Sequence, residues 1–272
     1  MEVLKNNVLT SKQEEKIKRI YTFNSLSNFI NNYRQDFINL GYEDGLDIER
    51  ITIGREDSIW NSYLPMIKLY LKAFDALPLN VIESSLEVGS GLGGGCYLLK
   101  KYFNILNVYG VDANYWHVLI SKIKFGNRGI SFRRYGSENF TKLEMKFDLI
   151  YSIEASSHFS NLTSFFSDVN KSLTDGGFFV YLDLFNEHQI DKIENEIYAN
   201  GFRLVKKENI NMGVLNSIKL NFQHKPTGFF NGIRTRIQSS FGMEPNESSE
   251  LFTKIENGVF LYNKYVFQKA KR

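Results

Sequence analysis

The sequence predicts an α/β fold in which helices cover both faces of a mostly parallel β-sheet. Between residues 81 and 183, segments rich in β-branched and aromatic residues alternate with segments of helical periodicity. The first of these strand-like segments, 81–88, runs into five glycines within seven positions, 89–95. Short turns, such as the Asp-Gly-Gly turn at 175–177, join the elements and leave room only for direct strand–helix connections.

Helical periodicity also dominates the part of the chain that precedes this alternation. Residues 11–40 place apolar side chains at helical spacing and predict one or two helices. Residues 58–76 predict another helix, which we expect to begin near Pro65 because proline is favoured in the first turn of a helix. We therefore expect residues 1–78 to form a helical segment that packs on the sheet domain as a cap.

The sheet domain is expected over residues 79–210. Its expected strands are 81–88, 107–111, 130–135, 147–152, 178–183 and 202–210, and its expected helices are 96–103, 114–125, 162–173 and 186–200. In such sheets a ligand binds beyond the carboxyl ends of the strands, where the strand order reverses. Residues that follow the strands are therefore the first candidates for a functional site.

The pattern loosens after residue 210. Residues 211–258 mix helix-like and loop-like stretches, and we expect them to form a helical insertion that acts as a substrate lid. Residues 259–272 contain the last expected strand, 259–269.

The composition excludes several classes of protein. Hydrophobic residues make up 43% of the 272 residues and charged residues 23%, which is typical of globular chains. No apolar run reaches ~18 residues, so no membrane span is expected. The N-terminal residues 1–20 have no apolar stretch after their charges, so no signal peptide is expected either. The single cysteine, Cys96, excludes an internal disulfide framework, and a reducing cytoplasm is the expected location. A net charge of +3 with scattered Lys and Arg does not predict a nucleic-acid partner.

The glycine run has the features of a ligand-binding loop. Glycines 89, 91 and 94 fit the pattern G-x-G-x-x-G, which keeps an NAD-dependent oxidoreductase as one alternative. Glu87 precedes the first glycine by two residues, where a carboxylate suits a ligand that carries a positive charge. Asp112 ends the second expected strand and can accept hydrogen bonds from two ribose hydroxyls. That role fits the ribose of either NAD or S-adenosylmethionine (SAM).

Several segments together resemble the class I SAM-dependent methyltransferases. Within that class the similarity is to small-molecule methyltransferases of the phthiotriol/phenolphthiocerol and fatty-acid O-methyltransferase type. The segments that carry it are 39–42, 86–95, Asp112, 147–152, 153–159, 173–177, 181–183 and 208–211. The resemblance implies a Rossmann-like sheet of seven strands, with the seventh, 259–269, antiparallel to its neighbours.

The resemblance also implies a SAM site, with S-adenosylhomocysteine (SAH) as the product. The residues expected to bind the cofactor are Glu87, Gly89, Ser90, Gly91, Gly93, Asp112, Ala113, Asn114, Ser137, Glu138, Ile153 and Tyr42. Ala113 and Asn114 are expected beside the adenine, and Tyr42 in a loop that closes over SAM. Gly136 stands where the family often has the Asp that meets the adenine amine, so we expect Ser137 or a backbone carbonyl to replace that contact.

Methyl transfer to oxygen or nitrogen can require a base near the acceptor. His158 follows the fourth expected strand, and Asp183 ends the fifth. Because adjacent parallel strands lie about 4.8 Å apart, these two side chains are expected to meet, with Asp183 orienting the imidazole of His158. Glu154 is the third candidate for acid–base work. The remaining histidines have no metal-ligand spacing, and no metal is expected.

Aromatic residues make up 15% of the chain and have two interpretations, an ordinary core or an apolar acceptor pocket. The candidates for a pocket wall are Tyr42, Trp60, Tyr63, Phe222, Phe229, Phe230 and Phe241. We expect a small-molecule or peptide acceptor, hydrophobic in character and methylated on a hydroxyl or carboxyl oxygen. N-methylation of a small molecule is the nearest alternative, and a homodimer is also considered.

Overall fold

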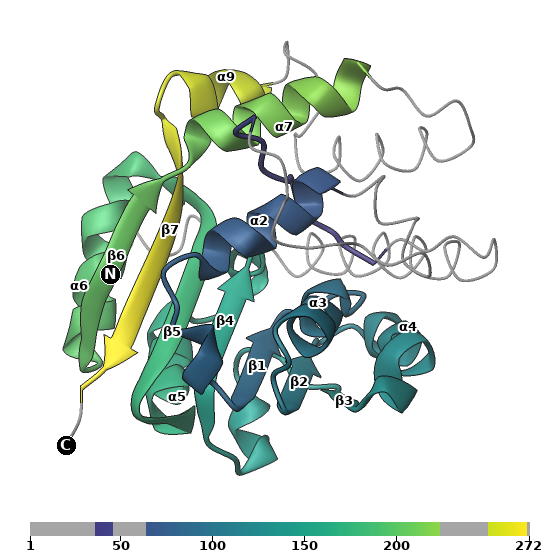
Figure 1. Ribbon diagram of the computed structural model, residues 1–272. Helices are drawn as coiled ribbons and strands as arrows, with labels where there is room; N and C mark the ends of the chain where they lie inside the picture. Colours follow the sequence, from purple (N-terminus) through teal and green to yellow (C-terminus); the bar gives the residue numbers. More distant parts are fainter. Residues whose placement is uncertain (1–35, 46–63, 224–249, 271–272) are drawn as a thin grey trace.

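The computed structural model describes residues 36–45, 64–223 and 250–270. Seven strands form one sheet in the order β3-β2-β1-β4-β5-β7-β6 (Figure 1). The strands are β1 (Ser84–Val88), β2 (Asn107–Val111), β3 (Ile130–Arg133), β4 (Phe147–Ile153), β5 (Leu173–Asn186), β6 (Phe202–Asn209) and β7 (Phe260–Lys269). Only β7 runs antiparallel to its neighbours, β5 and β6. This topology confirms the predicted Rossmann-like fold with an antiparallel seventh strand.

Helices cover both faces of the sheet in the described part of the chain (Figure 1). One face carries α2 (Leu64–Phe74), α3 (Gly94–Tyr102), α4 (Tyr115–Phe125), α7 (Asn211–Gln223) and α9 (Glu250–Glu256). The other face carries α5 (Leu162–Ser172) and α6 (Ile190–Ala199). Along β4, Leu149 and Tyr151 belong to the first core and Ile150 to the second, because successive side chains of a strand point to opposite faces.

Several element boundaries differ from the prediction, and two of them have a clear physical reason. β1 begins at Ser84 instead of residue 81, because residues 79–81 form a short 3₁₀ turn directly after Pro78. β5 runs over 173–186 instead of 178–183. The strand starts earlier because Leu173 already pairs with β4, and it ends later because pairing with β7 continues to Asn186. The Asp-Gly-Gly segment forms a bulge within the strand, where Gly176 has a φ of +80°. The predicted strand therefore covered only the regular middle of β5.

Phenylalanine and tyrosine rings fill the core beneath α5 and α6. Phe165 is fully buried, and its ring centroid lies 4.7–6.5 Å from five other rings, those of Phe140, Phe159, Phe166, Phe179 and Tyr181. Such distances are typical of favourable aromatic pairs. Much of the aromatic content thus serves an ordinary core, the simpler of the two interpretations.

Truncating the centre of this cluster should destabilise the protein strongly. The substitution Phe165→Ala leaves a cavity among five rings, and we expect it to lower the free energy of unfolding by about 3–5 kcal/mol. Val81→Ala, at a side chain that is 64% exposed, is the control and should change stability by less than about 0.5 kcal/mol. Denaturant unfolding measures both, and equal effects of the two variants would contradict the assignment of Phe165 to the core.

No helix within the described residues is both long and apolar enough to cross a membrane. In the same part of the chain, no three His, Cys, Asp or Glu side chains gather in a way that could hold a metal ion.

Candidate cofactor and acceptor site

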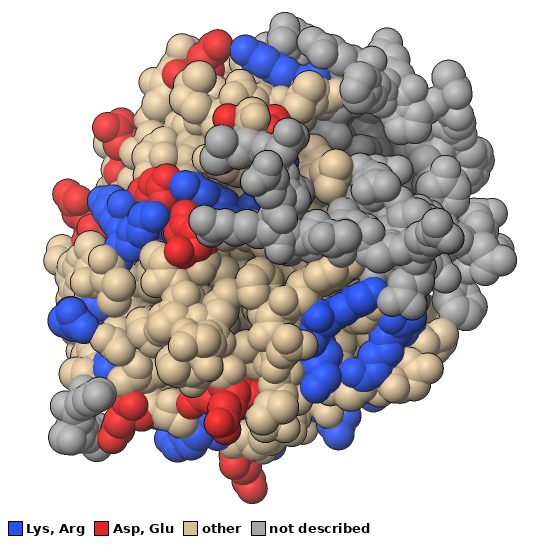
Figure 2. Space-filling model, in the orientation of Figure 1, with Lys and Arg blue, Asp and Glu red and all other residues tan. Residues whose placement is uncertain are grey.

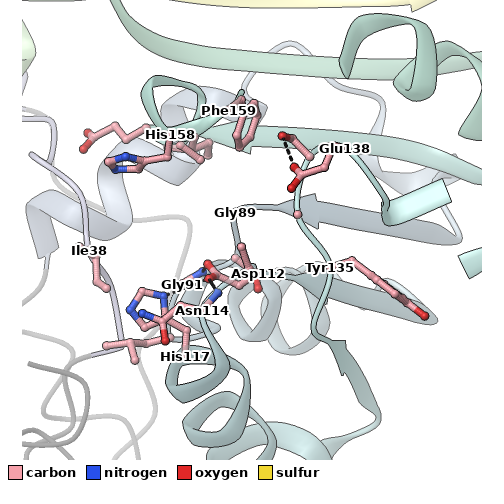
Figure 3. A pocket seen from close by; sticks show the side chains of 18 of the residues that line it. Ile38, Gly89, Gly91, Asp112, Asn114, His117, Tyr135, Glu138, His158 and Phe159 are labelled. Carbon is pink, nitrogen blue, oxygen red and sulfur yellow. Dashed lines mark hydrogen bonds and ion pairs between the residues drawn. The ribbon is translucent and has the colours of Figure 1, made fainter. Parts of the chain in front are cut away.

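A cavity of about 270 Å³ opens at the carboxyl ends of β1, β2 and β4. This is the place where the strand order reverses, between β1 and β4. The described residues around it are Asp36, Ile38, Tyr70, 89–92, 112–114, His117, 135–138, 153–155 and 158–160. Figure 3 shows that Asp112, Asn114 and His117 group on one side of this cavity, and that His158 and Phe159 lie across from them.

The loop after β1 approaches its neighbours too closely for any residue other than glycine at position 89. A Cβ atom at Gly89 would lie 2.3 Å from the Cβ of Ala155, which follows β4, and the backbone φ of Gly89 is +85°. Glycine adopts this conformation without the steric strain that other residues would suffer. The loop backbone therefore lines the cavity directly, as ligand-cradling loops do.

Asp112 joins this loop to the start of α4. Its Oδ2 accepts a hydrogen bond from the N–H of Gly91 at 2.9 Å, and its Oδ1 accepts from the N–H of Asn114 at 2.8 Å. Nδ1 of His117 lies 3.2 Å from Oδ1. Burial alone would raise the pKa of Asp112, but His117 and the two N–H groups outweigh it and lower the pKa overall. The carboxylate is thus ionised and faces the cavity.

Ser90 carries a polar atom that a ligand would satisfy. Its side chain is only 5% exposed and lines the cavity, and its Oγ has no hydrogen-bond partner in the described part of the chain. A buried hydroxyl without a partner is costly, and such a group in a cavity wall often marks the position of a missing ligand. Together with the ionised Asp112 and the close glycine backbone, Ser90 fits the hydroxyl-rich sugar of an adenosyl group.

Glu87 lies behind the cavity wall instead of lining it. Its carboxyl group is 1% exposed and accepts hydrogen bonds from Tyr70 Oη at 2.7 Å, Cys96 Sγ at 3.2 Å and Tyr151 Oη at 3.3 Å. Burial raises the pKa of Glu87 to about 7, against the opposing effect of these donors. Tyr70 itself lines the cavity, so it separates Glu87 from the ligand space.

Glu154 anchors the 36–45 segment beside the cavity. It follows β4 with a φ of +51°, a strained conformation for a residue other than glycine. Both carboxyl oxygens accept from the N–H of Leu40, at 2.9 and 3.1 Å, and Tyr262 donates to the same carboxyl group. Burial raises the pKa of Glu154 to about 8. Glu154 therefore lines the cavity and also fixes the 36–45 segment beside it.

His158 lies at the cavity across from Asp112 (Figure 3), and its side chain keeps contact with solvent. Desolvation by the surrounding protein lowers its pKa, although Asp112 across the cavity acts in the opposite direction. The imidazole is therefore neutral at pH 7 and able to accept a proton.

The structure does not bring Asp183 to His158 as expected. Asp183 accepts hydrogen bonds from the N–H of Ser156 at 2.9 Å, from Ser156 Oγ at 2.6 Å and from the N–H of Leu184 at 2.8 Å. It does not line the cavity. The ends of β4 and β5 are close enough for His158 and Asp183 to meet, but the turn at Ser156 lies between the two side chains and donates its hydrogen bonds to the Asp183 carboxylate. Asp183 thus positions the turn that carries His158.

The predicted cofactor residues divide into two groups. Gly89, Ser90, Gly91, Asp112, Ala113, Asn114, Ser137, Glu138 and Ile153 line the cavity, whereas Glu87, Gly93 and Tyr42 do not. Tyr42 packs on α7, where a Cβ at Gly213 would touch its ring, and Lys72 Nζ lies 5.6 Å from the ring centroid. Trp60, Tyr63, Phe229, Phe230, Phe241 and the side chain of Phe222 lie outside the described residues.

Sequence reasoning missed Asp36, Ile38, Tyr70, His117, Tyr135 and Phe159, all of which line the cavity. His117 had a local signal, because it follows the helix-capping Asn114 by three residues and therefore shares its side of α4. Asp36 and Ile38 had no such signal. They reach the cavity through the contact of Asp36 O with the N–H of Gly94 at 3.0 Å, 58 residues further along the sequence.

A family model described as a methyltransferase domain matches residues 61–224, more than half of the chain. The protein therefore belongs to this methyltransferase family, and the predicted class of enzyme, with SAM as methyl donor, is confirmed. Nothing in the comparisons supports the alternative of an NAD-dependent oxidoreductase.

Among its relatives is the phthiotriol/phenolphthiotriol dimycocerosates methyltransferase of Mycobacterium tuberculosis, 28% identical over 192 residues that cover 68% of each chain. The fatty-acid O-methyltransferase of Mycolicibacterium smegmatis is 24% identical over 185 residues, covering 68% of this chain and 66% of the relative.

The solved structures that resemble the chain support the fold alone, since their sequence identities are low. The StiE O-MT domain superposes with a TM-score of 0.66 at 18% identity, covering 93% of this chain and 90% of that one. The [4+2]-cyclase SpnF has a TM-score of 0.67 at 12% identity, covering 96% and 97%. Because a cyclase shares the fold, the reaction must be argued from the site.

The buried carboxyl group of Glu87 should make stability depend on pH. Between its ordinary pKa of 4.5 and its folded value of about 7, the folded protein keeps a proton that the unfolded chain has lost. The stability that this group contributes is therefore complete below pH ~4.5 and is lost as pH rises from there through about 7, by on the order of 3 kcal/mol. Glu87→Gln removes the titrating group, so the difference in unfolding free energy between wild type and variant should change across this pH window. A constant difference would contradict the assignment.

Proposed function

We propose that this protein transfers the methyl group of SAM to a hydroxyl or carboxyl oxygen of a small, hydrophobic, lipid-like acceptor. The observation that carries the proposal is the cavity at the reversal of strand order, which combines an ionised carboxylate, an unsatisfied serine hydroxyl and a neutral histidine within one space. The first two suit the adenosyl donor, and the third suits an acceptor that must lose a proton.

The residues on the cavity wall fit a bound SAM molecule. Asp112 is positioned for the ribose hydroxyls, because its Oδ2 still has a lone pair after it has accepted from Gly91. The 89–91 loop and Ser90 Oγ would hold the neighbouring part of the cofactor, and Asn114 with residues 136–138 the adenine. Bound SAM would supply the chemistry of the reaction, an electrophilic methyl group that the acceptor oxygen attacks in line with the carbon–sulfur bond, so that SAH leaves as a neutral thioether.

His158 is the best candidate for a general base. Its lowered pKa keeps the imidazole neutral at pH 7, and its place at the rim leaves it accessible to an entering acceptor. Glu154 is less suited to this role because a carboxyl group with a pKa of about 8 is mostly protonated at pH 7, and its oxygens already hold Leu40 and Tyr262. We assign Glu154 and Asp183 to positioning the cavity wall.

The class of acceptor follows from the relatives and from the apolar side chains at the cavity. The names of the relatives describe methylation of phthiotriol-type lipids and of fatty acids. Ile38 and Phe159 bring apolar surface to the same cavity that holds His158. The direct experiment incubates the protein with methyl-labelled SAM and either oleic acid or a long-chain alkylphenol. Labelled ester or ether supports the proposal, and transfer only to an added primary amine would contradict the choice of oxygen.

Removing the carboxylate of Asp112 should abolish tight cofactor binding. In Asp112→Ala the ribose hydroxyls and the N–H groups of Gly91 and Asn114 lose their acceptor, and we expect SAH affinity to fall about 100-fold. Asp168→Ala, on the outer side of α5, is the matched control and should leave affinity unchanged. Titration calorimetry with SAH measures both variants, and an Asp112 variant with normal affinity would disprove the ribose assignment.

Replacing His158 should separate catalysis from cofactor binding. In His158→Ala we expect methyl transfer to the long-chain alkylphenol, whose hydroxyl must lose a proton, to fall about 100-fold or more, while SAH affinity stays within about twofold of wild type. The control is His188→Ala, a histidine in the turn before α6 that does not line the cavity. A His158 variant with near-normal turnover would show that the base lies elsewhere or that the acceptor needs none.

A further inference from the structure

The outward side of α4 is apolar, although it faces solvent. Tyr115 is 52% exposed and Ile123 is 55% exposed, and Leu119, half-buried, lies between them in the sequence. At spacings of four residues these three side chains form one stripe along the helix. The buried side of the same helix is formed by other residues, among them Val118 and Phe125. A surface helix ordinarily turns polar residues outward, so this stripe calls for a partner.

Cations surround the stripe. Lys122 and Lys124 lie on either side of Ile123 in the sequence and therefore flank it around the helix. The guanidinium of Arg134 lies 6.0 Å from the ring centroid of Tyr115. Helix α3 packs beside α4 through the stacked rings of Tyr97 and Phe125, whose centroids lie 4.7 Å apart. It adds Lys100 and Lys101 to the cations on this surface. The guanidinium of Arg128 covers the ring of Tyr97. We call this surface the α4 face: Tyr115, Leu119, Ile123, Lys100, Lys101, Lys122, Lys124, Arg128 and Arg134.

Basic residues far outnumber acidic ones in the segment that forms the α4 face. Residues 94–135 contain seven Lys and Arg but a single acidic residue, Asp112, whereas the rest of the chain has more Asp and Glu than Lys and Arg. Lys100 and Arg134 donate to the carbonyl oxygens of Leu106 and Ala113 rather than to carboxylates. Figure 2 shows the resulting group of Lys and Arg over the region of α3 and α4.

We propose that the α4 face docks on a membrane surface that contains anionic phospholipids. An apolar helix stripe flanked by Lys and Arg is the pattern of helices that lie in the membrane interface, and tyrosine favours the headgroup level. Each Lys or Arg near an anionic leaflet adds to the attraction. A second copy of the chain suits the face less well because two such faces repel each other. A nucleic acid also suits it less well, since the rings of Tyr97 and Phe125 already stack on each other.

Docking by this face would place the cavity beside the lipid. Asn114 caps the start of α4, His117 lies in its first turn, and both line the cavity. Lys124 forms an ion pair with Asp36 at 2.8 Å, and Asp36 also lines the cavity. An acceptor held in the bilayer would then have a short path to the site. The proposal does not require the proposed function, because binding to vesicles is measured without methyl transfer.

The experiment compares sedimentation with phosphatidylcholine vesicles and with vesicles that also contain about 30% phosphatidylglycerol. We expect the protein to bind the anionic vesicles at least about tenfold more strongly, and added salt to weaken this binding. Lys122→Glu with Arg128→Glu should reduce binding at least about tenfold, and so should Ile123→Ser. The matched controls are Lys142→Glu with Lys192→Glu for charge and Val81→Ser for exposed apolar surface, and they should bind like wild type.

A spectroscopic measurement locates the contact. The chain has two tryptophans, so the Trp60→Phe variant leaves only Trp116, in the first turn of α4. Its emission should shift to the blue with anionic vesicles and stay unchanged with neutral ones. Equal binding to both kinds of vesicle, no binding to either, or equal loss in the face variants and their controls would overturn the proposal. Retained SAH affinity in each variant excludes misfolding as the cause of a loss.

Discussion

The hydrogen bonds that the Asp112 carboxylate accepts from the N–H groups of Gly91 and Asn114 hold the wall of the cavity together. They fix the loop after β1 against the start of α4, two segments that approach each other only because β1 and β2 are neighbours in the sheet. The same carboxylate faces the cavity in its ionised form. The geometry of the loop, the shape of the cavity and its negative charge therefore depend on one side chain.

Three further carboxyl groups are buried around this site, and each has a distinct structural use. Glu87 gathers two tyrosines and a cysteine behind the wall, Glu154 holds the 36–45 segment, and Asp183 holds the Ser156 turn. Burial raises the pKa of all three, so the protein keeps them only where several donors satisfy their oxygens. The site is thus rigid on the sides that β1, β4 and β5 provide. His158, at the rim, is the group left able to meet an acceptor.

Helix α4 connects the interior of the protein with its surface. One side supplies Asn114 and His117 to the cavity, and the other presents Tyr115 and Ile123 to solvent among cations. The two surfaces lie on opposite sides of the same helix, so about the width of one helix separates them. A ligand of the outer side would therefore lie close to the cofactor site, which is a sensible arrangement for an enzyme whose relatives are named for lipid substrates.

The sequence by itself determined the α/β class, the order of the strands along the chain and the polar residues that follow β1, β2 and β4, because these depend on local periodicity and on the glycines of one loop. Only the tertiary structure decided that Glu87 lies behind Tyr70, that Ser156 takes the carboxylate expected to orient His158, and that Asp36 and Ile38 reach the cavity. Those outcomes depend on which side chains occupy the space, and form the hydrogen bonds, between elements that are distant in sequence. Local pattern carries no information about that competition, since burial and hydrogen-bond geometry arise only when the sheet and its helices pack.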